Sequence, residues 1–102
     1  MIKVMTVLII EKDGNLLSFI KDLLSNCGIE VLTSSNGQIG LNVLKKNKNV
    51  HYIISDPRLP DMDMIEFLLK AASVQGKDSV TLVSPQQFFE FLGSPLYGRG
   101  RI

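Results

Sequence analysis

The feature that most limits what this chain can fold into is a regular alternation of short apolar runs with segments of helical spacing. Four apolar runs, at positions 4–10, 29–33, 50–55 and 80–83, have the length of strands and end at charged or turn-forming residues. Between them, apolar residues recur at intervals of three and four, as they do on one face of a helix. This alternation predicts an α/β fold with a doubly wound parallel sheet that has helices on both faces.

The residues that flank the helical segments support this prediction. The first helix follows a turn at which Asp13 is the expected N-cap, and Gly28 is the expected glycine at its C-terminal end. A second helix is expected over residues 39–44. A third is expected over residues 64–72, with three large apolar side chains on one of its sides: Ile65, Leu68 and Leu69.

Composition favours a single folded domain. The chain has 102 residues, of which 45% are hydrophobic and 21% charged, and its formal net charge is +1. This near balance gives no bulk electrostatic reason to bind nucleic acid or an anionic membrane surface. The apolar run at 4–10 is also far shorter than the roughly 18 residues that a membrane helix needs. We expect one domain over residues 1–92 and a tail over residues 93–102 that is rich in Gly and Arg.

Cys27 is the single cysteine of the chain, so no internal disulfide can form. The lack of a disulfide framework favours a cytoplasmic location. Because Cys27 lies at the end of a helical pattern, we expect a buried or half-buried thiol.

Polar side chains follow the apolar runs at the positions where a parallel sheet binds ligands. Ligands of open parallel sheets bind outside the carboxyl ends of the strands. Glu11 and Lys12 follow the first run, Asp56 follows the third, and Ser84 follows the fourth. A carboxylate there can coordinate a hard cation or accept a phosphoryl group, and a hydroxyl can donate a hydrogen bond to phosphoryl oxygens.

Three stretches of the sequence resemble the receiver domains of two-component signalling: residues 7–13 (VLIIEKD), 52–63 (YIISDPRLPDMD) and 81–85 (TLVSP). The resemblance implies the flavodoxin-like strand order 2-1-3-4-5. It also implies that Asp56 is the phosphoacceptor, that Glu11, Asp56 and the main-chain carbonyl of Arg58 help to hold Mg²⁺, and that Ser84 binds the phosphoryl group. The alternative role for Asp56 is that of a turn cap, and the alternative for Ser84 is a helix N-cap.

The chain departs from the receiver pattern in two respects. Lys12 stands where the family usually has a second acidic residue, so we expect Mg²⁺ binding to be weak or absent, with the Lys12 ammonium near Asp56 in place of the metal. The fifth strand and last helix of the family are not recognisable, so we expect them to be missing or replaced.

Three functions are compatible with these residues. The first is a receiver that takes a phosphoryl group on Asp56 from a histidine kinase or phosphotransfer protein and signals through an unidentified downstream protein, without being an enzyme. The second is a pseudo-receiver that binds a protein without phosphorylation. The third is a small-molecule-binding domain of flavodoxin type, which is disfavoured because no glycine-rich phosphate loop follows the first run.

We also expect a homodimer. Without a fifth strand, the run at 80–83 becomes a sheet edge with unpaired backbone groups, and such edges pair with other chains. A final helix over 85–92 adds a large apolar load: Phe88, Phe89, Phe91 and Leu92. The alternative is that residues 96–102 fold back over this edge.

Overall fold

The central element of the fold is a parallel sheet with the strand order β2-β1-β3-β4. The computed structural model describes residues 5–47, 49–56, 58–75, 81–83, 86, 87 and 90. This order confirms the receiver-like topology predicted for the first four strands. The strand bounds are β1 Thr6–Ile10, β2 Glu30–Ser34, β3 Tyr52–Ser55 and β4 Thr81–Val83.

Strand β1 is central because both of its faces are apolar. All five of its residues are buried, and it pairs in parallel with β2 on one side and β3 on the other. The register with β2 runs from Thr6 opposite Glu30 to Ile10 opposite Ser34. Strand β2 therefore starts at Glu30, one residue later than the apolar pattern predicts, because backbone pairing rather than side-chain polarity sets its ends.

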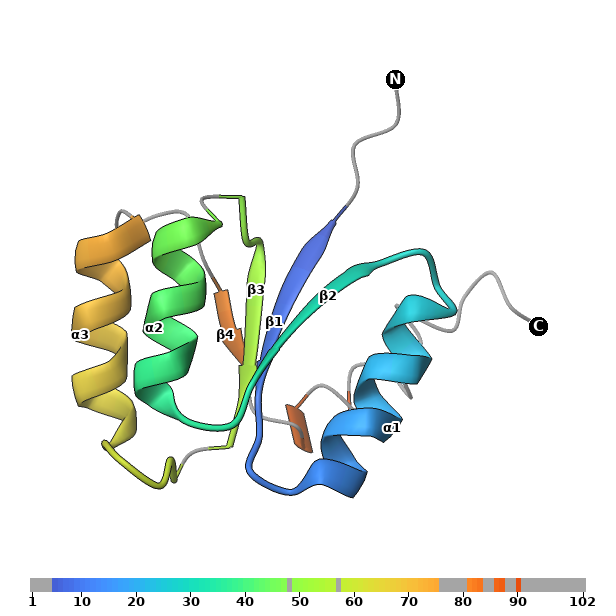
Figure 1. Cartoon of the computed structure of the whole chain (residues 1–102), viewed down its shortest axis with the longest axis horizontal. Coiled ribbons are helices and arrows are strands. Elements are labelled where there is room, and N and C mark those ends of the chain that lie inside the picture. Colours follow the sequence, from blue (N-terminus) through green and yellow to red (C-terminus); the bar gives the residue numbers. More distant parts are fainter. Residues whose placement is uncertain are drawn as a thin grey trace.

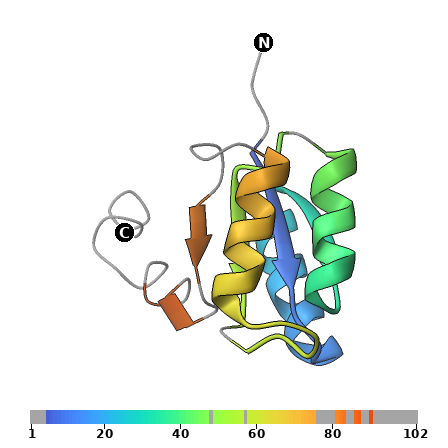
Figure 2. The same cartoon turned by 90° about the vertical axis from the view of Figure 1, so that its left-hand side faces the viewer.

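In the part of the chain that the structure describes, three helices form a layer on each face of this sheet. They are α1 Gly14–Ser25, α2 Gly37–Lys46 and α3 Met64–Gln75. Figure 1 shows α1 on one face of the sheet and α2 beside α3 on the other, and Figure 2 shows the same two layers from the side of α3. Asp13 caps α1 as predicted, because its side chain accepts hydrogen bonds from the backbone N–H groups of Asn15 and Leu16. Gly28 follows α1 with φ +78°, a conformation that glycine adopts without strain.

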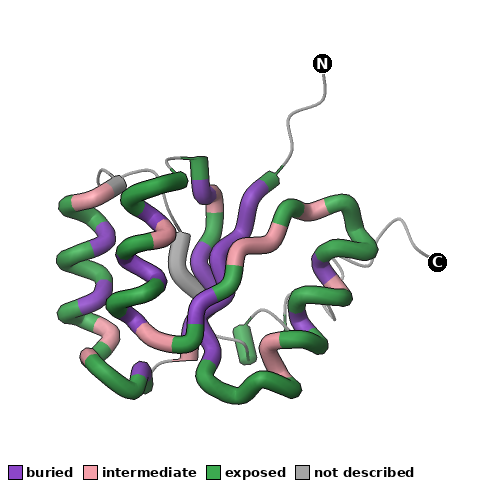
Figure 3. Tube along the Cα trace, viewed as in Figure 1, coloured by how far each residue is buried: buried purple, intermediate pink, exposed green. Residues whose placement is uncertain are grey.

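Each face of the sheet has its own hydrophobic core, because successive residues of a strand point to opposite faces. Toward α1, the core consists of Val7, Ile9, Ile20, Leu24 and Ile54. Figure 3 shows that the buried residues follow the strands and the inward sides of the helices. Toward α2 and α3, the larger core consists of Leu8, Ile10, Leu41, Leu44, Val50, Ile53, Leu59, Phe67 and Ala71.

Helix α3 turns an unexpected side toward the core. The fully buried Phe67 and the buried Ala71 pack inward, and Val74 packs partly against the same core, which explains why the helix extends to Gln75. The side with Ile65, Leu68 and Leu69 is exposed instead. The expectation for Cys27 is wrong: its side chain is exposed, because the chain turns away from the core after α1.

The predictions for the C-terminal part of the chain are only partly covered by the described residues. Among the described strands, β4 has a neighbour on one side only, as the predicted sheet edge requires. Residues 86, 87 and 90 are helical, in agreement with the helix expected over 85–92. Phe88, Phe89, Phe91, Leu92 and the tail lie outside the described residues, so the predicted domain boundary and homodimer stay predictions.

Polar contacts around Thr6 link the strands at the end of the sheet where β1 begins, opposite the carboxyl ends of the strands. The backbone N–H of Thr6 donates to Nδ1 of His51 at 3.0 Å, and the N–H of His51 donates to the Thr6 carbonyl at 2.8 Å. The Thr6 hydroxyl donates to Oε1 of Glu30 at 2.7 Å. These contacts tie β1 to both of its neighbours, and they account for His51 as a structural residue.

Helix α2 approaches β1 closely at Gly40. A Cβ atom at this position would lie 2.7 Å from Cδ1 of Ile10, well inside van der Waals contact. Ile10 is fully buried in the core between α2 and the sheet, so its side chain has no free space to move into. Glycine at position 40 therefore sets the distance between this helix and the central strand.

We expect Gly40→Ala to lower the free energy of unfolding by about 1–2 kcal/mol, because the overpacking cost exceeds the gain in helix propensity. Gly14→Ala is the matched control, since a Cβ at Gly14 would have no atom within 4 Å. Urea denaturation of both variants measures the difference. Equal stability of the two variants would contradict the close approach of α2 to β1.

Candidate functional site

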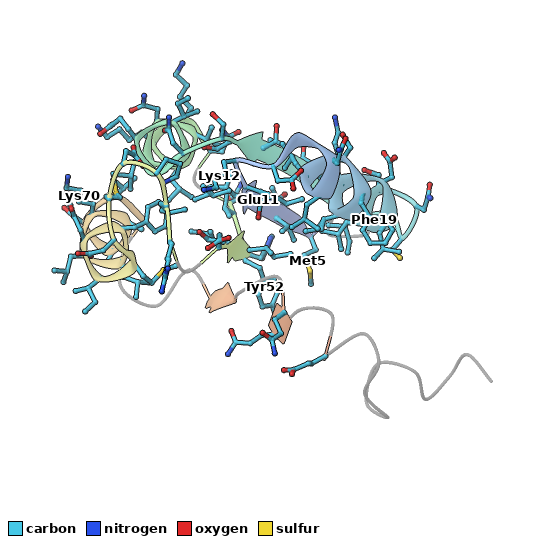
Figure 4. All side chains as sticks on the ribbon, turned by 90° about the horizontal axis from the view of Figure 1, so that it is seen from below. Met5, Glu11, Lys12, Phe19, Tyr52 and Lys70 are labelled. Atoms are coloured by element: carbon cyan, nitrogen blue, oxygen red, sulfur yellow. The ribbon has the colours of Figure 1, made fainter. Side chains whose placement is uncertain are left out.

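The carboxyl ends of β1 and β3 bring two acidic residues to the same edge of the sheet. Ile10 is the register partner of Ser55, so Glu11 and Asp56, the residues that follow the two strands, leave the sheet side by side. Figure 4 looks onto this end of the sheet, with Glu11 and Lys12 labelled. The structure thus joins the two carboxylates that the sequence placed at strand ends. Ser84 lies outside the described residues, and its role as a phosphoryl-binding hydroxyl stays a prediction.

Glu11 is the most unusual residue of this edge, because it is a carboxylate with only 4% of its surface exposed. One oxygen, Oε2, accepts a hydrogen bond from the backbone N–H of Asp13 at 3.0 Å. The other oxygen, Oε1, is buried and has no hydrogen-bond partner among the described residues. A buried, unpaired carboxylate oxygen is costly, on the order of 1–3 kcal/mol or more, unless a cation or a proton compensates it.

Asp56 is half-buried, and one of its oxygens takes part in the turn that follows β3. Its Oδ1 accepts a hydrogen bond from the backbone N–H of Arg58 at 2.8 Å. No hydrogen bond from the described residues is recorded at Oδ2. Asp56 therefore caps a turn, as the structural alternative predicts, and still keeps one oxygen for chemistry.

Lys12 and Arg58, the other two residues considered at this edge, are both exposed. The expectation that the Lys12 ammonium lies near Asp56 in place of a metal stays a prediction. Arg58 is exposed and forms an isolated antiparallel bridge with Asp63. The proposed contact of its carbonyl with a metal stays a prediction.

The loop after β3 is held in place by two aspartates whose roles the sequence analysis missed. Asp61 accepts hydrogen bonds from the backbone N–H groups of Gly37 at 2.8 Å and Gln38 at 2.9 Å, so it caps the first turn of α2. Asp63 caps α3 by accepting from the N–H of Glu66 at 2.8 Å. An acidic residue three positions before Glu66 was the available signal for the second cap. No local signal exists for Asp61, because its partners lie 23 and 24 residues earlier.

The hydrogen bonds to Asp61 change its pKa. Burial by itself raises the pKa of the Asp61 carboxyl, but the backbone N–H groups of Gln38, Gly37 and Asp61 itself, together with the positive charge of Lys70, outweigh burial. The net effect is a pKa below the ordinary value of 3.8. The Asp61 carboxylate is therefore stabilised in its charged form by the N-terminus of α2.

We expect the contribution of Asp61 to stability to be fully present at neutral pH and to be lost in acid. A lowered pKa in the folded state stabilises the fold above the unfolded value, and this stabilisation disappears as the pH falls below 3.8 through the lowered pKa. The difference in unfolding free energy between the unmodified chain and Asp61→Asn should shrink over this range. Urea denaturation at pH 7 and at successively lower pH measures it, and a difference that grows in acid would contradict the assignment.

Comparison with known proteins gives a consistent result for sequence and fold. No protein-family model matches the chain. Over 65 residues, which are 63% of this chain, it is 37% identical to the two-component response regulator ARR10 of Arabidopsis thaliana. The chain spans only 12% of the length of that relative.

Two solved structures share its architecture. A response regulator receiver domain protein from Clostridium thermocellum aligns with a TM-score of 0.71 and 25% identity, and the match covers 88% of this chain and 74% of that one. The receiver domain of Ssk1, solved in complex with the histidine phosphotransfer protein Ypd1 of Saccharomyces cerevisiae, aligns with a TM-score of 0.68 and 22% identity. That match covers 82% of this chain and 64% of that one.

The chain resembles response-regulator receiver domains in sequence, and it has their fold. The resemblance to receiver domains that the sequence suggested is thereby confirmed. None of the helices that the structure describes is long and apolar enough to cross a membrane. The part of the chain that the structure describes also holds no group of three or more His, Cys, Asp or Glu residues arranged to bind a metal.

Proposed function

We propose that the domain accepts a phosphoryl group on Asp56 from a histidine kinase or phosphotransfer protein and signals through protein–protein contacts. The observation that carries this proposal is the buried, unpartnered Oε1 of Glu11 beside Asp56. No structural contact of the described residues uses this oxygen. A second buried carboxylate next to Asp56 is expected at a site that binds a cation while a phosphoryl group is transferred.

The proposed reaction uses the oxygen of Asp56 that the turn leaves free. Oδ2 attacks the phosphorus of a phosphohistidine, and the new O–P bond forms as the N–P bond breaks. The electron pair of the broken bond goes to the imidazole nitrogen of the donor, which becomes neutral histidine or takes up a proton from water. The bond from the Arg58 N–H to Oδ1 keeps the carboxylate oriented during the transfer.

The residues of this edge partly fit Mg²⁺. Mg²⁺ uses one or two protein carboxylates and completes its octahedral shell with water and phosphate oxygens, which matches Glu11 and Asp56. When bound, the ion would offset negative charge on the phosphoryl oxygens. Lys12, beside Glu11 in the sequence, adds a positive charge near the same edge and opposes a cation there. We therefore expect a site that binds Mg²⁺ weakly.

The proposed partners follow from the same reasoning. In the complex of Ypd1 with Ssk1, a histidine phosphotransfer protein is the partner of a receiver domain, which supports a donor of this kind for Asp56. A cytoplasmic location is part of the proposal, because a chain with a single cysteine has no internal disulfide framework. The downstream protein is not identified by any feature of this domain.

The second candidate is a pseudo-receiver that binds its partner without phosphorylation. Two observations favour it: Lys12 replaces a carboxylate, and Oδ1 of Asp56 is engaged in a turn. Both functions require the same fold, so the two candidates differ only in whether Asp56 gains a phosphoryl group.

We expect incubation with acetyl phosphate and Mg²⁺ to add one phosphoryl mass to the chain, and Asp56→Asn to abolish this gain because an amide is a poor nucleophile. Mass spectrometry of the intact protein measures both. Asp13→Asn is the matched control, since asparagine preserves the N-cap of α1 at a nearby position. Equal labelling of the Asp56→Asn variant would contradict the assignment, and no labelling of any variant would favour the pseudo-receiver.

We expect Lys12→Asp to raise the affinity for Mg²⁺ by about tenfold, which corresponds to about 1–2 kcal/mol for a two-unit charge change at an exposed position beside the ion. Lys21→Asp, the same charge change on α1, should leave the affinity nearly unchanged. Isothermal titration calorimetry measures all three proteins. Sub-millimolar affinity in the unmodified domain would contradict weak binding.

A further inference from the structure

The loop between β3 and α3 is attached to the first turn of α2 by two neighbouring residues. Asp61 accepts hydrogen bonds from the backbone N–H groups of Gly37 at 2.8 Å and Gln38 at 2.9 Å. Met62 lies against Gly37, since a Cβ atom at Gly37 would be 2.8 Å from both Cγ and Sδ of Met62. In Figure 1, this loop passes below the start of α2 before α3 begins. We call the contact of these four residues the loop–α2 contact.

The base of the same loop orients Asp56. The backbone N–H of Arg58 donates to Oδ1 of Asp56 at 2.8 Å. Arg58 also forms an isolated antiparallel bridge with Asp63, which closes the segment between these two residues. Asp61 lies within the closed segment. Attachment of Asp61 to another element therefore helps to fix the N–H group that holds the Asp56 carboxylate.

We propose that Asp61 is a positioning residue for phosphoryl transfer to Asp56, because it fixes the loop that carries the Arg58 N–H against the N-terminus of α2. This inference rests on the proposed function of Asp56 as the phosphoacceptor. Asp61 makes and breaks no bond to the phosphoryl group, and it acts through the Arg58 N–H alone. Orientation matters for the rate, since a misplacement of about 1 Å at a reacting group can slow a reaction by about a hundredfold.

Helix α2 does not need Asp61 in order to begin, because it has an N-cap of its own. Oδ1 of Asn36 accepts a hydrogen bond from the backbone N–H of Ile39 at 2.8 Å. Asp61 is an exposed residue, so water could reach the N–H groups that it binds, as it does at many helix ends. The contact of Asp61 therefore has its main effect on the loop and not on the helix.

A buried leucine gives the loop a second point of attachment. Leu59, the residue after Arg58, is only 9% exposed and belongs to the core between the sheet and the layer of α2 and α3. One apolar anchor fixes the position of the chain beside Arg58 but leaves the loop free to rotate about it. Asp61 and Met62 add a contact to a different element, which restricts that rotation. The direction of the Arg58 N–H is thus set by both anchors together.

Removal of the Asp61 carboxylate tests the proposal in the full chain. Asp61→Ala should lower the rate at which acetyl phosphate and Mg²⁺ phosphorylate Asp56 by about tenfold, and Asp61→Asn, which keeps one acceptor oxygen, should restore part of the rate. Asn36→Ala is the matched control, because it removes a hydrogen bond to the same helix and none to the loop. Mass spectrometry of the intact protein over time measures the rates. Equal slowing by Asp61→Ala and Asn36→Ala overturns the proposal, because Asp61 would then act only as a helix cap.

A variant on α2 displaces the loop without changing Asp61. In Gly37→Ala the new Cβ would meet the flexible side chain of Met62, which must move, while the N–H that Asp61 binds is kept. We expect the rate of phosphorylation to fall by about threefold. Gly14→Ala is the control, since Gly14 is the first residue of α1 and a Cβ there would have no atom within 4 Å. Equal rates for the two glycine variants would count against the loop–α2 contact, and this pair carries the test if Asp61→Ala does not fold.

The amide signal of Arg58 in ¹H–¹⁵N NMR separates this inference from the proposed function. The signal reports the hydrogen bond to Asp56 without any phosphorylation. Asp61→Ala should shift it and speed up its hydrogen exchange by about tenfold, whereas Asn36→Ala should leave both unchanged. If the unmodified chain gains no phosphoryl mass, the proposed function fails, and this signal still decides whether Asp61 positions Asp56. An Arg58 signal that is the same in Asp61→Ala as in the unmodified chain overturns the inference.

Discussion

The parallel pairing of β1 with β3 is the constraint on which the rest of this domain depends. β1 is buried along its whole length, so neither of its faces can tolerate a change of register. A slip of one residue would exchange Leu8 and Ile10 with Val7 and Ile9 between two cores of different shape. The same register carries Glu11 and Asp56 to one edge of the sheet. The candidate site is thus a consequence of how the core packs, and it needs no special backbone conformation to form.

The carboxylates near that edge differ in whether their oxygens have hydrogen-bond partners, and this difference distinguishes structural residues from functional ones. Asp13, Asp61 and Asp63 all accept hydrogen bonds from helix N-termini, so their charges have clear structural partners. Oε1 of Glu11 has none among the described residues, and Glu11 is the most buried of the carboxylates at this end. A fold selected for stability alone would gain by replacing it with an apolar residue of similar size. This cost is why the edge is better explained by chemistry than by packing.

Helix α3 is joined to the candidate site by the loop that follows β3. Its N-terminus is fixed by Asp63, at the end of the loop that starts at Asp56. The loop is also tied to α2 through Asp61, so the site and the helix layer form one hydrogen-bonded unit. A shift of this loop caused by modification of Asp56 would act on α3 through the hydrogen bonds of Asp56 with Arg58 and of Asp63 with Glu66.

Much of this architecture follows from the sequence alone, because its signals are local. Apolar runs and helical spacing predict the elements, and polar residues at the ends of those runs predict Glu11 and Asp56 as site residues, since parallel strands end at one edge. Periodicity also groups Ile65, Leu68 and Leu69 on one side of a helix, but it cannot say whether that side is inside. Only the tertiary structure decides this, because Phe67 and Ala71 fill the space above the sheet and leave the leucines outside. The exposure of Cys27, the cap that Asp61 provides and the unpaired oxygen of Glu11 likewise depend on residues that are distant in sequence and meet only when the sheet is formed.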